Sequence, residues 1–287
     1  KNEDGLSNFT YSDFNALFRL FYNNNNPSKE RFDNISIVKK SLKNIGCDFD
    51  ELPAILIEKQ MPAGINGQGL MLNVPYDFKA VINAGLGAHI WMHEMGHGLQ
   101  GLLCRINYPI LEGCEWVPGS MATCFAEGMA ETNAYFTRNI EWQLKYTDLD
   151  KNTIIDRRKV AEKYSTAFIR YWLYRCMKEV EYYSNPDKSY QQIQEELMNK
   201  YLLVDSEFKF EPLASMRYVS YPLYLQNYLI ADMIACHVHS YLENRFGYNY
   251  CFNKDVMNYI KDHGSAKFVI HLAAYYDFTY EDNSEYE

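Results

Sequence analysis

The chain has 287 residues, of which 47% are hydrophobic and 23% are charged, and this balance excludes a wholly disordered protein. Its formal net charge is −9 and it has no long run of Lys or Arg, which argues against a nucleic-acid or anionic-membrane partner. No uninterrupted apolar stretch of about 18 residues occurs, so no transmembrane helix is predicted.

The seven cysteines are odd in number and include no Cys-x-x-Cys pair. They favour free thiols in a reducing, cytoplasmic compartment over a disulfide framework. No break in composition indicates a second domain. We therefore expect a single domain over residues 1–287, with a helical lead-in over 1–50, a core over 51–279 and an acidic tail over 280–287.

Two short helices are predicted first in the chain, over residues 14–22 and 34–45, the second ending at Gly46. Two apolar runs, 54–61 and 68–74, then flank a Gly-rich turn. This pattern predicts a β-hairpin, the only strand pair that the sequence indicates clearly.

After the hairpin the pattern becomes helical. Asn152 is expected to cap a long helix, and Pro222 to lie in the first turn of another. The predicted fold class is mainly α (α+β), a helical lobe with a small β element. The predicted helices cover residues 82–103, 125–139, 152–183, 189–202, 222–246, 255–262 and 266–275.

Residues 93–97 read His-Glu-Met-Gly-His, an HExxH motif inside a predicted helix. Residues four apart on a helix share a face, so the imidazoles of His93 and His97 can reach one tetrahedral zinc ion. Glu94 lies one residue round the helix, where its carboxylate can take a proton from a water molecule and pass it to the leaving amine. His89 is too far along the helix to share the ion with His97, and we expect it in the core or behind the ligands.

A catalytic zinc ion needs a third protein ligand, and four downstream glutamates are candidates: Glu112, Glu115, Glu127 and Glu131. Glu127 and Glu131 are four apart in a helical stretch, so both point to one place. We assign Glu127 as the ligand and Glu131 as the carboxylate that orients His93 through its second ring nitrogen. A solvated Glu pair is the alternative. Glu115, in a stretch with Gly and Pro that is typical of a loop, is the main rival ligand.

His-Glu-Met-Gly-His followed by Phe-Ala-Glu-Gly-Met-Ala-Glu resembles the gluzincin metallopeptidases of the thimet oligopeptidase and angiotensin-converting enzyme group. The resemblance covers residues 50–275. It implies one zinc ion, an oligopeptidase activity, Glu127 as third ligand and an acidic residue, Glu131, four positions later. It also implies an edge strand that pairs with the extended peptide substrate, and a further N-terminal lobe as partner.

The segment Tyr221-Pro-Leu-Tyr224-Leu-Gln-Asn-Tyr228 is similar to the family's Tyr-x-x-Tyr segment at the start of a late helix. The resemblance implies that one tyrosine stabilises the tetrahedral intermediate and a neighbour binds substrate. A phenol can donate a hydrogen bond to an oxyanion without carrying a charge. Tyr224 is our first choice, Tyr221 the second and Tyr228 the third. A tyrosine of the core is the alternative for each, because the chain has 25 tyrosines.

The sequence thus predicts a zinc-dependent peptidase acting on short oligopeptides. Two alternatives stay open: a catalytically incompetent, zinc-stabilised helical module or isolated lobe that only binds peptides, and a metal-dependent hydrolase of another bond. The remaining candidates are expected to be structural. They are His237 and His239, which face different sides of a helix with His237 nearer the cleft, the core residue His271, and Arg217 in a surface salt bridge.

Overall fold

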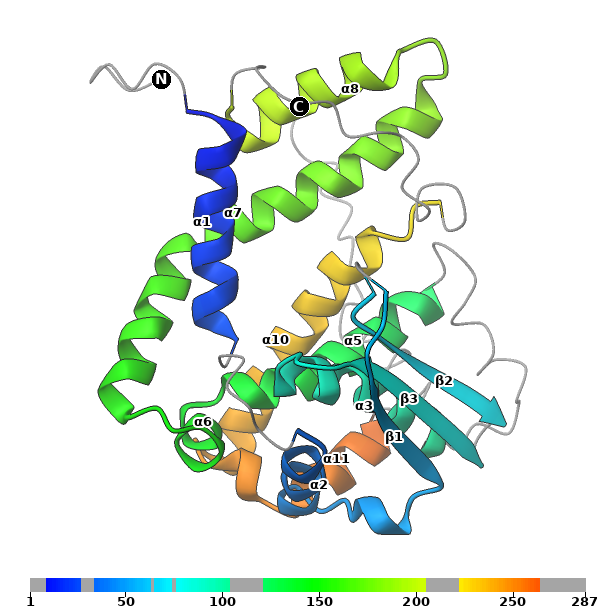
Figure 1. The fold of residues 1–287 in the computed structure, drawn as a ribbon, viewed down its shortest axis with the longest axis vertical. Helices are drawn as coiled ribbons and strands as arrows, with labels where there is room; N and C mark the ends of the chain where they lie inside the picture. The colour runs from blue at the N-terminus through cyan, green and yellow to red at the C-terminus, as the bar shows by residue number, and fades with distance from the viewer. Residues whose placement is uncertain are drawn as a thin grey trace, which may run out of the picture.

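A computed structural model of the chain describes residues 9–26, 34–62, 65–73, 76–103, 121–204 and 222–263. Within these ranges the protein is mainly helical and has a small three-stranded sheet, which confirms the predicted fold class (Figure 1). None of the described helices combines the length and the apolar character needed to cross a membrane.

The elements follow one another in a simple order, with the sheet early in the chain and long helices after it. The helices and strands are α1 (Tyr11–Asn25), α2 (Asn34–Asn44), β1 (Ala54–Lys59), β2 (Gly67–Asn73), β3 (Asp77–Asn83), α3 (Ala88–Leu103), α5 (Met121–Tyr135), α6 (Ile140–Tyr146), α7 (Lys151–Ser184), α8 (Tyr190–Leu197), α10 (Gln226–Phe246) and α11 (Asp255–His263). Short helical turns lie between them: η1 (Phe49–Glu51), η3 (Phe136–Arg138), η4 (Met198–Leu202) and η5 (Tyr250–Phe252).

The sheet has the strand order β1-β3-β2, in which β3 runs parallel to β1 and antiparallel to β2. The predicted hairpin is therefore wrong, because its two strands do not pair with each other. Strand β3 was not predicted, and its end overlaps the helix predicted over 82–103, which begins only at Ala88. In β3 the side chains of Phe78, Ala80 and Ile82 are buried and alternate with half-buried ones. A turn at Gly85, with φ of +82°, separates this strand from α3.

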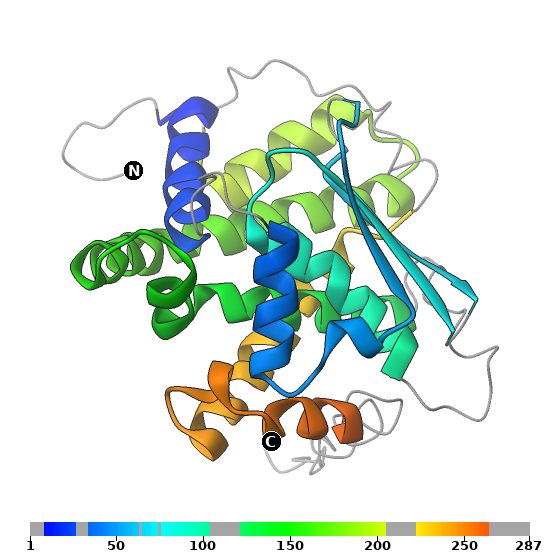
Figure 2. The same cartoon turned by 60° about the horizontal axis from the view of Figure 1, so that its bottom comes forward.

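The central helix α3 lies between the sheet and α5, and α5 packs in turn against α10 (Figure 2). The backbones of α3 and α5 touch at Gly96, the fourth residue of the HExxH motif. A Cβ atom there would lie 2.6 Å from Ala130 Cα and 2.8 Å from the Met129 carbonyl oxygen. Asn133 Nδ2 also donates a hydrogen bond to the Met92 carbonyl oxygen, at 2.5 Å. The two helices are thus held at a separation that only glycine permits.

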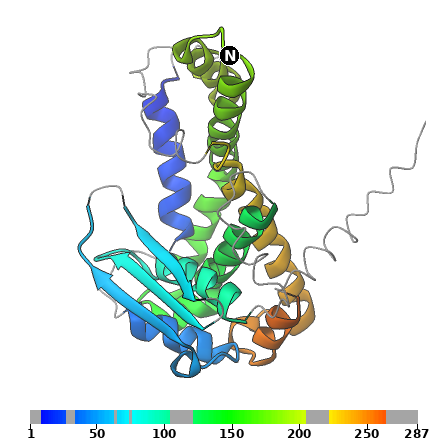
Figure 3. The same cartoon turned by 90° about the vertical axis from the view of Figure 1, so that its right-hand side faces the viewer.

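A second helical layer is formed by α1, α7 and α8, which rise away from the sheet (Figures 1 and 3). Its own apolar cluster includes Phe14, Tyr174 and Ile193. The main core instead lies around the sheet, α2, α3 and α10, where Phe78 and Trp91 are fully buried. Among the described residues there are thus two apolar clusters, and the HExxH helix α3 belongs to the main core.

Several helices begin or end at residues other than those predicted. Asp150, not Asn152, caps α7, because its side chain accepts hydrogen bonds from the backbone N–H groups of Asn152 and Thr153. Helix α10 begins at Gln226 rather than near Pro222, since Leu223 has a left-handed φ of 61° that interrupts the helix. The helix predicted over 266–275 lies outside the described residues.

Candidate metal centre

Three predicted ligands converge across the α3–α5 contact, and we call them the metal cluster: His93, His97 and Glu127. Glu127 Oε2 lies 3.5 Å from His93 Nε2 and 3.8 Å from His97 Nε2. Ligand atoms at the corners of a tetrahedron around zinc are separated by about 3.3–3.6 Å, given metal–ligand bonds of about 2.0–2.2 Å. The observed separations are close to this spacing.

The carboxylate of Glu127 shows whether a cation fits this place. Its Oε2 atom is buried and has no hydrogen-bond partner within the described part of the chain, although it faces two imidazole nitrogens. A buried carboxylate oxygen without a partner is costly, and coordination of a metal ion would satisfy it. The side chains of His93 and His97 keep 15% and 20% of their surface exposed, so the cluster is not sealed inside the protein. The donor set and its burial therefore fit a zinc ion with an open position.

The charged groups of the metal cluster shift one another's pKa values. Burial alone would lower the pKa of His93, but the carboxylates of Glu127 and Glu131 raise it well above its ordinary value. Burial alone would raise the pKa of Glu127, but the imidazoles of His93 and His97, together with the Tyr224 hydroxyl, lower it to about 2. Glu127 therefore stays ionised at neutral pH, the form in which a carboxylate binds a metal ion.

Glu131 lies where a carboxylate can orient the first histidine. Its Oε1 atom is 3.1 Å from His93 Nδ1, which leaves His93 Nε2 directed at Glu127. Its Oε2 atom is 3.9 Å from Arg138 Nη2, and Arg138 Nη1 is 3.7 Å from Asp232 Oδ1. A chain of alternating charges thus runs from the metal cluster through η3 to α10 and supports the ring of His93 from behind.

Glu94 is 8% exposed, and its carboxylate makes no hydrogen bond within the described ranges. Strand β2 passes close beside it, because a Cβ atom on Gly67 would lie 3.1 Å from Glu94 Oε1. A side chain at position 67 would therefore press on the carboxylate. The edge strand keeps Glu94 confined and leaves its oxygens without a competing protein donor.

The tyrosine segment reaches the metal cluster through one residue. The Tyr224 hydroxyl donates a hydrogen bond to Glu127 Oε1, the oxygen that does not face the histidines. The Tyr228 ring lies 5.5 Å from that of Tyr224, between centroids. Tyr221 lies outside the described residues. The structure thus brings Tyr224 to the ligand carboxylate, while the predicted oxyanion would require its hydroxyl to turn away from Glu127.

The other histidines occupy different places. His89 Nε2 is 3.2 Å from the Tyr22 hydroxyl, one helical turn before His93. His239 is buried and bonds the Tyr250 hydroxyl and the Thr132 carbonyl oxygen, both at 2.7 Å, as expected of a structural residue. His237 is exposed on the same helix. The remaining candidates lie outside the described residues: Glu112, Glu115, Arg217 and His271.

The sequence analysis missed the charged residues behind the ligands. Arg138 follows Glu131 by seven residues, close to two helical turns, so helical spacing could have pointed to it. Asp232 lies on α10 and accepts a hydrogen bond from the Tyr135 hydroxyl, and no helical spacing from a predicted ligand indicates it. Helical spacing from a predicted ligand is therefore a usable signal for Arg138 but not for Asp232.

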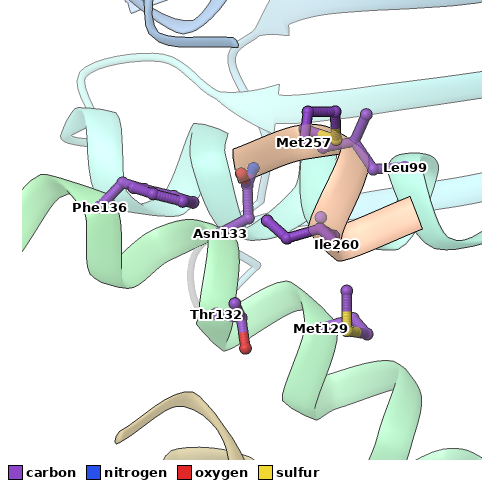
Figure 4. Close-up of a pocket in the computed structure, with 8 residues that line it drawn as sticks. Leu99, Met129, Thr132, Asn133, Phe136, Met257 and Ile260 are labelled. Atoms are coloured by element: carbon purple, nitrogen blue, oxygen red, sulfur yellow. The ribbon is translucent and has the colours of Figure 1, made fainter. Parts of the chain in front are cut away.

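A small cavity lies where α3, α5 and α11 meet (Figure 4). It contains none of the ligands of the metal cluster, and most of its lining is apolar, so we interpret it as a packing gap in the core. The lining residues are Gly96, Leu99, Met129, Thr132, Asn133, Phe136, Met257 and Ile260.

Comparison with protein-family models finds no match to this chain, and comparison with curated proteins finds none either. Its function is therefore inferred from the motif and from the geometry of the metal cluster.

Proposed function

We propose that this protein is a zinc-dependent peptidase that hydrolyses short oligopeptides. The observation that carries the proposal is the buried Glu127 Oε2, which has no described hydrogen-bond partner and faces His93 Nε2 and His97 Nε2 at 3.5 and 3.8 Å. The HExxH spacing and the resemblance of residues 93–97 and 125–131 to gluzincin metallopeptidases support the same conclusion.

His93, His97 and Glu127 would hold the ion, and Glu131 would keep the proton of His93 on Nδ1 so that Nε2 stays free as a ligand. When bound, zinc supplies Lewis-acid polarisation of the scissile carbonyl and lowers the pKa of a water molecule. Arg138 and Asp232 would hold Glu131 in place through the charge contacts behind it.

Glu94 is the residue that moves the proton. Its carboxylate takes a proton from the attacking water and later donates it to the amine of the leaving peptide. Its confinement by β2 favours this role, because a carboxylate with no protein donor is free to accept from water. Tyr224 steadies Glu127 in the resting protein and lies close enough to the metal cluster to donate to an oxyanion when its hydroxyl turns.

The test separates metal binding from turnover. Glu94→Gln should keep zinc but lose about 10²- to 10⁴-fold in kcat/KM on a mixture of short peptides, because the general base is gone. Glu127→Gln should lose both zinc and turnover, because it removes the ligand charge. Zinc content by elemental analysis and cleavage followed by mass spectrometry give the two readouts.

The matched control is Glu243→Gln, the same change at an exposed position of α10, which should alter neither readout. A Glu94→Gln variant that cleaves as fast as the parent would overturn the mechanism. A parent protein that holds zinc and cleaves no peptide would contradict the peptidase and favour the zinc-stabilised module, and a panel of other substrates would then test hydrolysis of another bond.

A further inference from the structure

A continuous line of aromatic rings begins at the metal cluster and runs onto α7. The Tyr224 hydroxyl contacts Glu127, and the Tyr224 and Tyr228 ring centroids are 5.5 Å apart. The Tyr228 ring in turn lies 5.4 Å from that of Trp172. Tyr224, just before α10, and Tyr228, on α10, thus connect the predicted ligand Glu127 to Trp172 on α7.

The line continues from α7 onto α1 and returns to the HExxH helix. The Trp172 and Tyr171 centroids are 6.2 Å apart, and Tyr171 is 4.5 Å from Phe18. Phe18 lies 6.3 Å from Tyr22, whose hydroxyl is 3.2 Å from His89 Nε2. His89 is one turn before His93 on α3, so the contacts close into a loop through the metal cluster. We call the six rings the aromatic arc: Tyr224, Tyr228, Trp172, Tyr171, Phe18 and Tyr22.

The aromatic arc is accessible. None of its six side chains is buried, and Tyr22 is 39% exposed. Adjacent aromatic rings that stay partly exposed beside a polar cluster are typical of ligand sites, where apolar walls surround a few oriented polar groups.

The charge next to the aromatic arc selects among ligands. The Arg175 guanidinium lies over the Trp172 ring at 5.2 Å and over the Tyr171 ring at 5.6 Å. A cationic side chain would meet this positive charge at the ring faces that could otherwise attract it. An aromatic or large apolar side chain meets no such penalty and gains from displacing water from the rings.

We propose that the aromatic arc is a substrate subsite that takes one aromatic or large apolar side chain of the peptide, with Trp172 at its centre. This inference rests on the proposed peptidase function, since it places the side chain close to the bond that the metal cluster would cleave. It assigns specificity to α7 and α1, helices that carry no ligand of the metal cluster.

The experiment compares peptides that differ only by Phe or Ala, with the Phe moved along the sequence one position at a time. The parent protein should prefer Phe at one position by roughly 10- to 100-fold in kcat/KM. Trp172→Ala should reduce that preference to a few-fold and change cleavage of the Ala peptide much less. Trp172→Leu, which keeps an apolar side chain, should restore part of the preference.

Circular dichroism and zinc content show whether Trp172→Ala folds. If it does not, Tyr228→Leu is the second variant, since it changes the aromatic arc from another helix, and it should also weaken the preference for Phe. The control is Tyr241→Ala, an exposed tyrosine on α10 that stacks on Tyr259 outside the aromatic arc, which should leave the preference unchanged. A preference that is equal in the parent and both variants, or a parent with none at any position, overturns the subsite.

Calorimetric binding of the same peptides to the zinc-loaded parent and to Glu94→Gln keeps the two proposals separate. If the Phe peptide binds more tightly than the Ala peptide but the zinc-loaded parent cleaves neither, the subsite is supported and the peptidase is contradicted. Cleavage without a Phe preference supports the peptidase and contradicts the subsite. Failure of both proteins to bind either peptide contradicts the subsite as well.

Discussion

The helix pairs α3–α5 and α1–α7 are held together by different kinds of contact. Between α3 and α5 the backbones touch, and a Cβ atom on Gly96 would lie 2.6 Å from Ala130 Cα. Between α1 and α7 aromatic rings fill the interface, with Phe18 4.5 Å from Tyr171 and Phe21 4.5 Å from Phe168. The closest contact of the first pair is with backbone atoms at Gly96, whereas the second pair meets through aromatic side chains that can adjust.

The difference matches the demands on each pair. A metal site requires its ligand atoms within a few tenths of an ångström, so helices that carry ligands benefit from contacts that cannot relax. A surface that binds side chains of varying shape can tolerate rings that shift by rotamer changes. We therefore expect disturbance of α3–α5 to affect metal affinity, and disturbance of α1–α7 to affect stability and the proposed side-chain preference but not metal affinity.

The largest effect is expected from Gly96→Ala. Alanine normally stabilises a helix interior by about 1 kcal/mol relative to glycine. Here the added methyl group meets the backbone of α5, so we expect the free energy of unfolding to fall by about 3 kcal/mol. Zinc affinity should fall too, because α5 carries Glu127. Urea unfolding of the metal-free protein and zinc titration measure the two effects, and a variant equal to the parent in both would exclude backbone contact.

Lowering the pH is expected to reduce the free energy of unfolding by a smaller amount. The residue responsible is His239, which joins α10 to α5 by its hydrogen bond to the Thr132 carbonyl oxygen. Burial lowers the pKa of His239 to about 4, so it stays neutral in the folded protein. In the unfolded chain His239 takes up a proton near pH 6.5. The stability that the neutral, buried His239 contributes is therefore complete above that pH and is lost as the pH falls toward 4. The free energy of unfolding should drop by about 2 kcal/mol between pH 7 and pH 5 from this residue.

The matched variant for this pH effect is His239→Gln, which removes the titrating group. Urea unfolding at pH 7, 6 and 5 should give a shallower pH dependence in the variant than in the parent. Identical pH dependence in the two proteins would show that His239 is not held neutral by burial.

The smallest effect is expected from Phe21→Leu in the α1–α7 interface. Loss of the ring pair with Phe168 should lower the free energy of unfolding by about 1 kcal/mol. Zinc affinity should not change, because neither helix carries a ligand of the metal cluster. A fall in zinc affinity as large as that of Gly96→Ala would contradict the proposed division between the two helix pairs.

Part of the fold could be predicted because its signals are local. The stop at Gly46 placed the end of α2 to within a residue, and the first predicted helix, 14–22, lies within α1 but is three residues short at each end. The sheet could not be predicted in the same way. Strand β3 is a short alternating run directly before an apolar helix, and its place between β1 and β2 depends on pairings between distant segments.

Residue spacing places His93 and His97 on one helix face with Glu94 beside them, because helical geometry follows from spacing alone. For the same reason Glu127 and Glu131 point the same way. That these two faces meet depends on the packing of α3 against α5, since Glu127 reaches the histidines through the close contact at Gly96. The contact of Tyr224 with Glu127 and the aromatic arc likewise depend on packing between helices far apart in the chain, which no local pattern encodes.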